Sequence, residues 1–275
     1  MARSATVRQD GTMSQGPRQV TSPKNPLVRT YRDAAGGEPA DVMLVEGTRL
    51  LREALQAGLA IRSAAVSPRL RDDALRADLS ARAEQFVECG DDVLERMSAV
   101  ETHQGAVAVV QRPAWREADL LGKGISPLVV AAAGVRDPGN LGAVLRTAEA
   151  AGATGVLALA GGADPFREKA VRGSMGSVFR LPVLAGTKPQ QVVEFARRHL
   201  LQLVVADGNA TNDYLRVDLR KPTLLVVGAE AQGVPPELLA AADQRMRIGI
   251  APTVESLNVA VASGVILFEA RRQRL

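Results

Sequence analysis

Short, almost wholly apolar runs recur in the second half of the chain, separated by longer amphipathic stretches. The runs read PLVVAAAG, TGVLALA, LQLVVAD and TLLVVG. Helices are predicted between them at residues 140–151, 165–173, 188–199, 235–242 and 256–272. Because the apolar positions are consecutive rather than alternating, both faces of each strand must be covered, as in a parallel sheet between two helical layers. The pattern predicts a doubly wound α/β domain, in which ligands bind at the carboxyl ends of the strands.

The first half shows the same alternation with shorter segments. Strands are predicted at VMLVEG, IRSAAVS, QFVEC and GAVAVV. Helices are predicted at TRLLREALQAG, at residues 71–85 and at DDVLERMSA. This half therefore predicts a second, smaller α/β domain.

Changes in composition predict four segments. Residues 1–20 are polar and basic and lack periodicity, so we expect a disordered tail there. Residues 21–112 make up the smaller domain and residues 127–275 the larger one. Between them, residues 113–126 contain Pro and Gly and are expected to form a linker.

Basic side chains cluster just after the tail, in the segment TSPKNPLVRTYRD with Lys24, Arg29 and Arg32. One interpretation is a solvated helix that begins after Pro26. The other is a basic arm that touches phosphate. The formal net charge of +4 fits a polyanionic partner but does not identify one.

The chain offers few groups for disulfide or metal chemistry. Cys89 is the only cysteine, so no intramolecular disulfide can form and a reducing compartment is expected. With only two histidines besides, we expect no metal site. No apolar run is long enough to cross a bilayer and no signal-peptide pattern is present, which predicts a cytoplasmic protein without a membrane partner.

Three glycine-containing loops follow predicted strands in the second half. They read VRDPGNLGAVLRTAEAAG, GAEAQGVPPELL and IGIAPTVESLNVAVASG. There is no GxxxxGK[ST] and no GxGxxG between a strand and a helix, so a P-loop and the usual dinucleotide fingerprint are absent. In the first loop Asn140 is a plausible helix N-cap, and in the third Ser256 or Asn258 is one. All three loops should meet at one edge of the sheet.

In this order and at these separations, the loops resemble the three motifs of the SpoU (TrmH-like) family of RNA 2′-O-ribose methyltransferases, within the SPOUT superfamily. Asn140, Gly142, Arg146 and Thr147 carry the first motif, and Gly228, Glu230 and Gly233 the second. The third is Ser256 to Val259, followed by Ser263 and Gly264. The first half resembles, more loosely, the L30e-like substrate-binding domain of many members, through SPKNPLVR, EGTRLLREAL and HQGAVAVV.

The resemblance implies a deep trefoil knot in the second domain, S-adenosyl-L-methionine as methyl donor, an RNA substrate and a homodimer formed through the knotted domain. The catalytic residues it implies are Arg146, Asn140, Glu230, Ser256 and Asn258. The cofactor-binding residues are Asp207, Gly208, Gly228, Ala229, Glu230, Ile248, Ile250, Ser256, Leu257, Asn258 and Val259. Basic side chains expected to contact the RNA are Lys24, Arg29, Arg32, Arg49, Arg146, Arg167 and Arg172, and for Arg167 and Arg172 a solvated helix face is the alternative interpretation. Two positions depart from the family pattern, Gly249 where Pro is common and Ala231 where Gly is common.

Arginine at position 146 remains protonated at physiological pH, so we expect it to anchor phosphate and developing negative charge rather than to act as a base. The expected reaction is methylation of a ribose 2′-hydroxyl, with 23S ribosomal RNA favoured over transfer RNA. Methylation of a base by a related knotted enzyme is the alternative within the superfamily. An inactive ribosome-assembly protein that binds RNA with the same fold is the alternative from another class.

Overall fold

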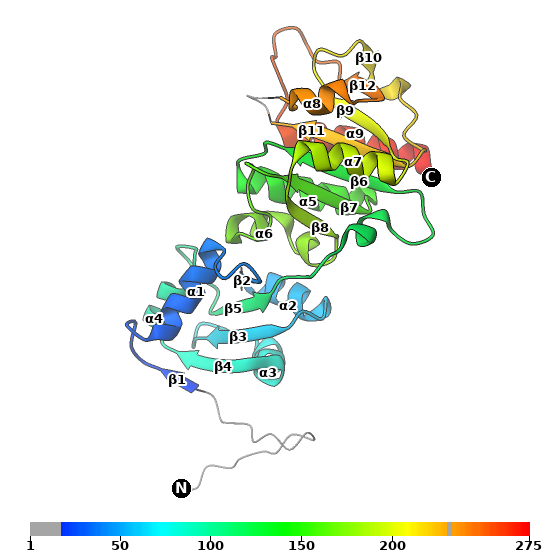
Figure 1. Ribbon diagram of the computed structural model, residues 1–275. Helices are drawn as coiled ribbons and strands as arrows, with labels where there is room; N and C mark the ends of the chain where they lie inside the picture. The colour runs from blue at the N-terminus through cyan, green and yellow to red at the C-terminus, as the bar shows by residue number, and fades with distance from the viewer. Residues whose placement is uncertain (1–17, 230–232) are drawn as a thin grey trace, which may run out of the picture. The chain divides into compact units, whose positions relative to one another are not determined.

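The computed structural model describes residues 18–229 and 233–275, and the chain divides into two compact units between Arg112 and Pro113. Figure 1 shows the helices and strands of each unit, which are treated separately below. In the part of the chain that is described, no helix has the length and apolar character needed to cross a membrane.

Unit 1 is a five-stranded sheet with helices on both faces, in the strand order β1-β4-β3-β5-β2. The strands are β1 (Arg18–Val20), β2 (Val42–Glu46), β3 (Ile61–Val66), β4 (Ala83–Cys89) and β5 (Ala106–Gln111). The helices are α1 (Pro26–Gly36), α2 (Thr48–Gln56), α3 (Asp73–Arg82) and α4 (Asp91–Met97). Strand β5 runs antiparallel to β2 and β3, whereas β1, β3 and β4 are parallel.

The start of unit 1 differs from expectation. Arg18–Val20 pairs with Val87–Cys89, and Val20 is buried, so the expectation of disorder is wrong for residues 18–20. Residues 1–17 lie outside the described part of the chain. The next segment forms the expected helix: the Asn25 side chain accepts the Leu27 amide, and Pro26 supplies the fixed φ of a first helical residue. Contact of its basic side chains with phosphate, the other interpretation, stays a prediction.

Unit 2 contains a seven-stranded sheet in the order β10-β12-β9-β11-β6-β7-β8, and every strand pair in it is parallel. The strands are β6 (Leu128–Ala133), β7 (Gly155–Leu159), β8 (Val183–Thr187), β9 (Gln202–Ala206), β10 (Asn212–Asp213), β11 (Thr223–Gly228) and β12 (Gln244–Arg247). The helices are α5 (Pro138–Ala151), α6 (Glu168–Ser174), α7 (Pro189–Arg198), α8 (Pro236–Ala240) and α9 (Val259–Arg274). The predicted parallel α/β domain is confirmed.

Both faces of the central strands are buried, as the continuous apolar runs predicted. Val129 and Ala131 of β6 pack with Phe195 of α7 and Leu238 of α8 on one face. The residues between them point to the opposite face because side chains alternate along a strand. On that face helices α5 and α9 pack against one another. Each fully buried Val or Leu contributes roughly 1.5–3 kcal/mol of transfer free energy.

The expected linker is partly structured. Its residues Glu117–Leu121 form a 3₁₀ turn whose Leu120 is fully buried in the core of unit 2. A Cβ at Gly155 would lie 2.4 Å from the Leu120 side chain, so this glycine in β7 allows the turn to pack closely. Residues 117–121 therefore pack as part of unit 2 within the segment expected to be a linker.

Strand β12 lies near the far edge of the sheet, yet the chain returns from it to α9, which packs on α5 beside the central strands. The connecting residues 248–258 therefore pass the ends of β9 and β11. The trefoil knot implied by the sequence resemblance would lie in this return. It brings the latest part of the domain next to its earliest helix.

Candidate cofactor and RNA site

The three motif-bearing loops meet at the carboxyl edge of the sheet in unit 2. The Ala229 amide, just after β11, donates to the carbonyl of Ala133 at the end of β6, at 3.0 Å. The Asn258 side-chain amide, just before α9, donates to Asn140 Oδ1 on α5 at 3.1 Å. Residues far apart in sequence are thus joined by direct hydrogen bonds, as the motif positions predicted.

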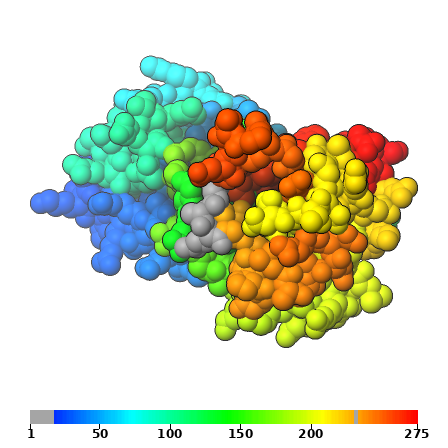
Figure 2. All heavy atoms as spheres, turned by 90° about the horizontal axis from the view of Figure 1, so that it is seen from above, coloured from blue at the N-terminus to red at the C-terminus, as the bar shows by residue number. Residues whose placement is uncertain are grey.

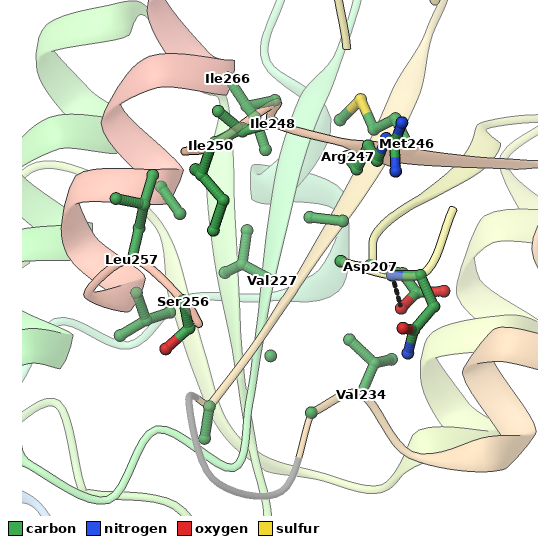
Figure 3. Close-up of a pocket in the computed structure, with 18 of the residues that line it drawn as sticks. Asp207, Val227, Val234, Met246, Arg247, Ile248, Ile250, Ser256, Leu257 and Ile266 are labelled. Carbon is green, nitrogen blue, oxygen red and sulfur yellow. Dashed lines mark hydrogen bonds between the residues drawn. The ribbon is translucent and has the colours of Figure 1, made fainter. Parts of the chain in front are cut away.

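A cavity of about 540 Å³ opens at this edge, between the ends of β9, β11 and β12 and the segment that leads into α9. Figure 3 shows Ser256 and Leu257 on one side of it, Asp207 on the other and Val227 between them. In Figure 2 the segment after β9 (yellow) and the segment before α9 (orange-red) lie next to each other on the surface. The volume lies within the range of small-molecule sites in proteins.

Most of the cofactor-binding residues implied by the resemblance line this cavity. They are Asp207, Gly208, Gly228, Ala229, Ile248, Ile250, Ser256, Leu257 and Val259. Asn258 is not a wall residue but stands between two of them. Glu230 lies outside the described residues.

The cofactor-binding set expected from the sequence left out further wall residues. Gly233 and Gly249 had been noted only as motif positions, and the others, which were missed, are Ala206, Asn209, Val227, Val234, Met246, Arg247, Glu255, Ala262 and Ile266. Several close strand ends, such as Ala206 of β9 and Met246 of β12. The strand-end rule that located the three loops would have found Ala206 and Val227. Strand β12 itself was not predicted, because QRMR alternates polar residues with one apolar residue and is too short for a clear period.

The charge on one wall of the cavity is fixed by an ion pair. Asp207 follows β9, and Arg245 of β12 donates to its Oδ2 from Nε at 2.9 Å. Burial opposes ionisation of Asp207, but the hydrogen bonds from Arg245 and from the Asn209 amide outweigh it and hold the pKa of the carboxyl below its ordinary value. The wall therefore carries a carboxylate at neutral pH.

The start of α5 corrects one expectation. The N-cap is Asp137, whose side chain accepts the Asn140 amide at 2.8 Å and also binds Lys169 Nζ at 2.7 Å. Asn140 is therefore not the cap but lies in the first turn, which leaves its side chain available for Asn258. At the other motif, Asn258 is the cap of α9, accepting the amides of Ala260 and Val261.

Arg146 lies one helical turn after Gly142 on α5. Its side chain is exposed, and it has no hydrogen bond or ion pair with any residue that the structure describes. It does not line the cavity, although α5 packs on α9, whose first turns do. Close packing of α5 and α6 depends on Gly142, where a Cβ would lie 2.6 Å from the Ala170 carbonyl oxygen.

The other predicted RNA-binding residues fall into two groups. Lys24, Arg32, Arg49 and Arg167 are exposed, and none of their side chains has a polar partner within residues 18–229 and 233–275. Arg29 lies 3.5 Å from Asp33, and Arg172 is paired with Glu168. Pairing with a carboxylate makes these two arginines less available to an external anion.

Geometry alone defines the class: a parallel-sheet α/β protein with a ligand cavity at the carboxyl ends of its strands and without the dinucleotide glycine motif. Its walls offer apolar side chains, backbone groups of glycines, the acidic side chains of Asp207 and Glu255 and the basic side chain of Arg247.

Comparisons with known proteins agree. Residues 127–268 match the SpoU rRNA methylase family, and residues 31–108 match the MRM3-like substrate-binding domain. The chain is 33% identical over 266 residues to an uncharacterized tRNA/rRNA methyltransferase of Synechocystis sp., covering 93% of this chain and 94% of that one. It is 30% identical to a 23S rRNA uridine 2′-O-methyltransferase of Streptomyces viridochromogenes, covering 98% and 97%.

Among solved structures, the AdoMet-bound rRNA methyltransferase of Sinorhizobium meliloti superposes with a TM-score of 0.84 at 32% identity, covering 94% of this chain and 98% of that one. The chain belongs to the SpoU rRNA methylase family. The resemblance, the fold class and the methyltransferase class predicted from the sequence are thereby confirmed.

Proposed function

We propose that the protein transfers the methyl group of S-adenosyl-L-methionine to a ribose 2′-hydroxyl of 23S ribosomal RNA. Family membership and the Streptomyces viridochromogenes relative, named for that chemistry on 23S rRNA, support the proposal. The observation that carries it is the bond between Asn140 and Asn258, which links the arginine-bearing helix α5 to the wall of the cavity. Ribosomal RNA as the substrate agrees with a cytoplasmic location.

The cavity fits the methyl donor. Val227, Ile248 and Leu257 give apolar walls for an adenine ring, and the backbone at Gly228 and Ala229 offers hydrogen-bonding groups. The wall also carries polar side chains for the rest of the donor, which are the acidic Asp207 and Glu255 and the basic Arg247. When bound, the donor supplies an electrophilic methyl group on a sulfonium.

Each polar residue has a proposed role. Arg146 binds a phosphate next to the target ribose and stabilises negative charge that develops on the 2′-oxygen. Asn140, Asn258 and Ser256 orient the nucleotide and hold the loops, and Glu230 positions neighbouring groups. Because a guanidinium does not accept a proton near pH 7, a phosphate oxygen or water takes the proton of the hydroxyl.

Substitution of Arg146 tests the catalytic assignment. Arg146→Ala should reduce methyl transfer by on the order of 10²–10³-fold, as for the loss of other groups that stabilise transition-state charge. Arg146→Lys should also be poor, because an ammonium lacks the planar fork. Donor affinity, measured by calorimetry, should stay unchanged in both. Wild-type turnover in either variant would refute the role.

The reaction and the RNA are tested together by mapping ribose methylation across total RNA from cells with and without the protein. The expected result is the loss of one 2′-O-methyl mark in 23S rRNA. Loss of a base methyl group would favour the related base-modifying chemistry. Loss of a 2′-O-methyl mark in transfer RNA would show that transfer RNA, not 23S rRNA, is the substrate. An unchanged map, with no transfer from labelled donor, would favour an inactive RNA-binding protein.

Unit 1 is proposed to bind the substrate RNA. It matches a substrate-binding domain, and its exposed Lys24, Arg32 and Arg49 have no acidic partner among the described residues. Phosphate contacts from these side chains would give affinity without sequence selectivity. Arg29, which lies near Asp33, is expected to contribute less.

The proposed homodimer forms through α9. Val261 and Phe268 are 54% and 51% exposed and lie two turns apart, so they share one face of the helix. Phe268→Glu should convert a dimer to a monomer in analytical ultracentrifugation. Leu200→Glu, at an exposed leucine after α7, should leave the dimer intact. A wild-type protein that sediments as a monomer at micromolar concentration would contradict the proposal.

A further inference from the structure

Six basic side chains come from residues 134–180, and the structure divides them into two sets. One set is held by carboxylates: Lys169 by Asp137, Arg172 by Glu168 and Arg180 by Glu149. The other set is Arg136, Arg146 and Arg167. All three are exposed, and none has a hydrogen bond or ion pair to any described residue. Arg136 was not among the candidates from the sequence.

The unpaired set comes from three segments that pack together. The Val135 carbonyl accepts the Ala163 amide at 2.8 Å, so the loop that carries Arg136 lies against the loop that leads to Arg167. Gly139 and Gly142 of α5 both lie against α6, where their added Cβ atoms would be 3.6 Å from Lys169 Cε and 2.6 Å from the Ala170 oxygen. Arg146 follows them on the same side of the helix, because residues at this spacing share a face.

The same segments border the donor cavity. Ala133, three residues before Arg136, accepts a hydrogen bond from Ala229, which lines the cavity. The carboxylates of Asp137, Glu149 and Glu168 are bound to the paired set, and Asp164, in the loop before Arg167, accepts the Phe166 amide, so none of these four forms an ion pair with the unpaired arginines. Like charges left unpaired beside a ligand site attract an anion, and a guanidinium binds phosphate through two parallel hydrogen bonds.

We propose that Arg136, Arg146 and Arg167 form a phosphate-binding strip, which holds the RNA backbone on both sides of the nucleotide to be methylated. The proposal rests on the proposed function; it adds Arg136 as a binding residue and joins it with Arg146 and Arg167 in one surface. The strip contacts phosphodiesters rather than bases, so it fixes the position of the strand and leaves selection of the sequence to other parts of the protein.

Salt dependence of binding tests the strip. The affinity of the full-length protein for an in vitro transcript of 23S rRNA is measured by filter binding from 0.05 to 0.5 M KCl, conditions chosen for a slope analysis. Arg136→Gln and Arg167→Gln should each lower the slope of log affinity against log salt by about 0.7, which corresponds to a loss of about fourfold at 0.15 M salt. In the double variant the slope should fall by about twice as much as in either single variant.

Two controls isolate the effect. Arg198→Gln removes the same charge from α7, on the opposite face of the sheet, where Arg198 is paired with Glu117 at 2.7 Å. It should leave the slope unchanged. Arg136→Lys and Arg167→Lys should restore most of the slope, because a lysine still neutralises one phosphate. Calorimetry with S-adenosylhomocysteine checks that each variant retains a folded donor cavity.

A wild-type slope in Arg136→Gln and Arg167→Gln, or an equal loss in Arg198→Gln, would overturn the strip. Its failure is distinguishable from failure of the proposed reaction. If wild-type protein transfers no methyl group but the two slopes fall, the strip stands and the reaction is wrong. If transfer occurs and the slopes do not change, the reaction stands and the strip is wrong.

Discussion

Asn258 performs two tasks with one side chain. Its oxygen accepts the first amides of α9, and its amide group donates to Asn140. Asn258→Ala should lower the free energy of unfolding by about 1 kcal/mol through loss of the cap. Asn258→Asp keeps the acceptor for the cap but loses the donor for Asn140. Both variants should lose methyl transfer on the order of 10²-fold, because the two loops are no longer held together.

Thermal unfolding and turnover separate the two tasks. Asn258→Asp should melt close to wild type, whereas Asn258→Ala should melt lower. An Asn258→Asp variant with full turnover would show that the contact with Asn140 is not needed.

Glu269 makes the stability of α9 depend on pH. Hydrogen bonds from Arg272 at 2.7 Å, and then from Gln273, lower the pKa of this carboxyl to about 2. A lowered pKa adds stability above the unfolded-state value, and this stability is lost as the pH falls through the folded-state value. Glu269→Gln should therefore be less stable than wild type at pH 7. The difference should shrink as the pH falls from about 4.5 to about 2.

Denaturant unfolding at a series of pH values measures this difference. Glu194→Gln on α7 is the control, because Glu194 is exposed and has no polar side-chain partner in the described ranges. It should show no such trend. A Glu269→Gln deficit that persists at pH 2 would point to lost packing rather than to the charge.

At the scale of elements, the sequence was informative where segments are apolar and long. Strands β6, β7, β9 and β11 were predicted because consecutive apolar residues exclude water from both faces. Strand β8, VLAGT, is an edge strand, and strand β12, QRMR, is next to the other edge strand, β10. Both were missed, because strands at or near the edges of a sheet can be short and tolerate polar residues. Their pairing depends on neighbours that only the tertiary structure supplies.

The site, too, was predictable from the sequence only in part. The sequence located nearly half of the residues of the cavity wall, since loops after parallel strands must share one edge. The pairing of basic side chains could be read from the chain only in part. Arg172 and Glu168 have a helical spacing, whereas Lys169 meets Asp137 only through the fold. The cap of α5 was misassigned because Asp137 and Asn140 are both good capping residues.

The contact between α5 and α6 depends on the absence of a side chain at Gly142. A Cβ there would lie 2.6 Å from a carbonyl oxygen and 2.8 Å from the backbone of Gly173 and Ser174. Gly142→Ala should therefore destabilise the protein by about 1–3 kcal/mol, as overpacking does, and reduce turnover because α5 carries Arg146.

The control is Gly36→Ala at the end of α1, where an added Cβ meets nothing within 4 Å. It should be neutral or slightly stabilising, since alanine favours helix. Thermal unfolding compares the two variants. If Gly142→Ala and Gly36→Ala were equally stable, α5 and α6 would be able to move apart without loss of stability.

At the scale of the whole molecule, the two units divide the work. Every residue of the cavity wall belongs to unit 2, whose core includes the turn at residues 117–121. A fragment of residues 113–275 should fold and bind S-adenosylhomocysteine like the intact chain. Its affinity for 23S rRNA should fall, because unit 1 supplies part of the proposed RNA contacts. Calorimetry and filter binding measure the two affinities, and a fragment with full RNA affinity would remove unit 1 from recognition.

The walls of the cavity come from residues 206–266, which a ribosome translates late. Unit 1 and strands β6 to β8 emerge earlier, and domains generally fold as they are made. A polypeptide that ends between residues 113 and 258 would contain unit 1 and bind RNA, but it would lack a complete cavity for the methyl donor. Such a product would compete with the intact protein for the same transcript. A late nonsense mutation should therefore be more harmful than deletion of the gene in a cell that also carries a functional copy.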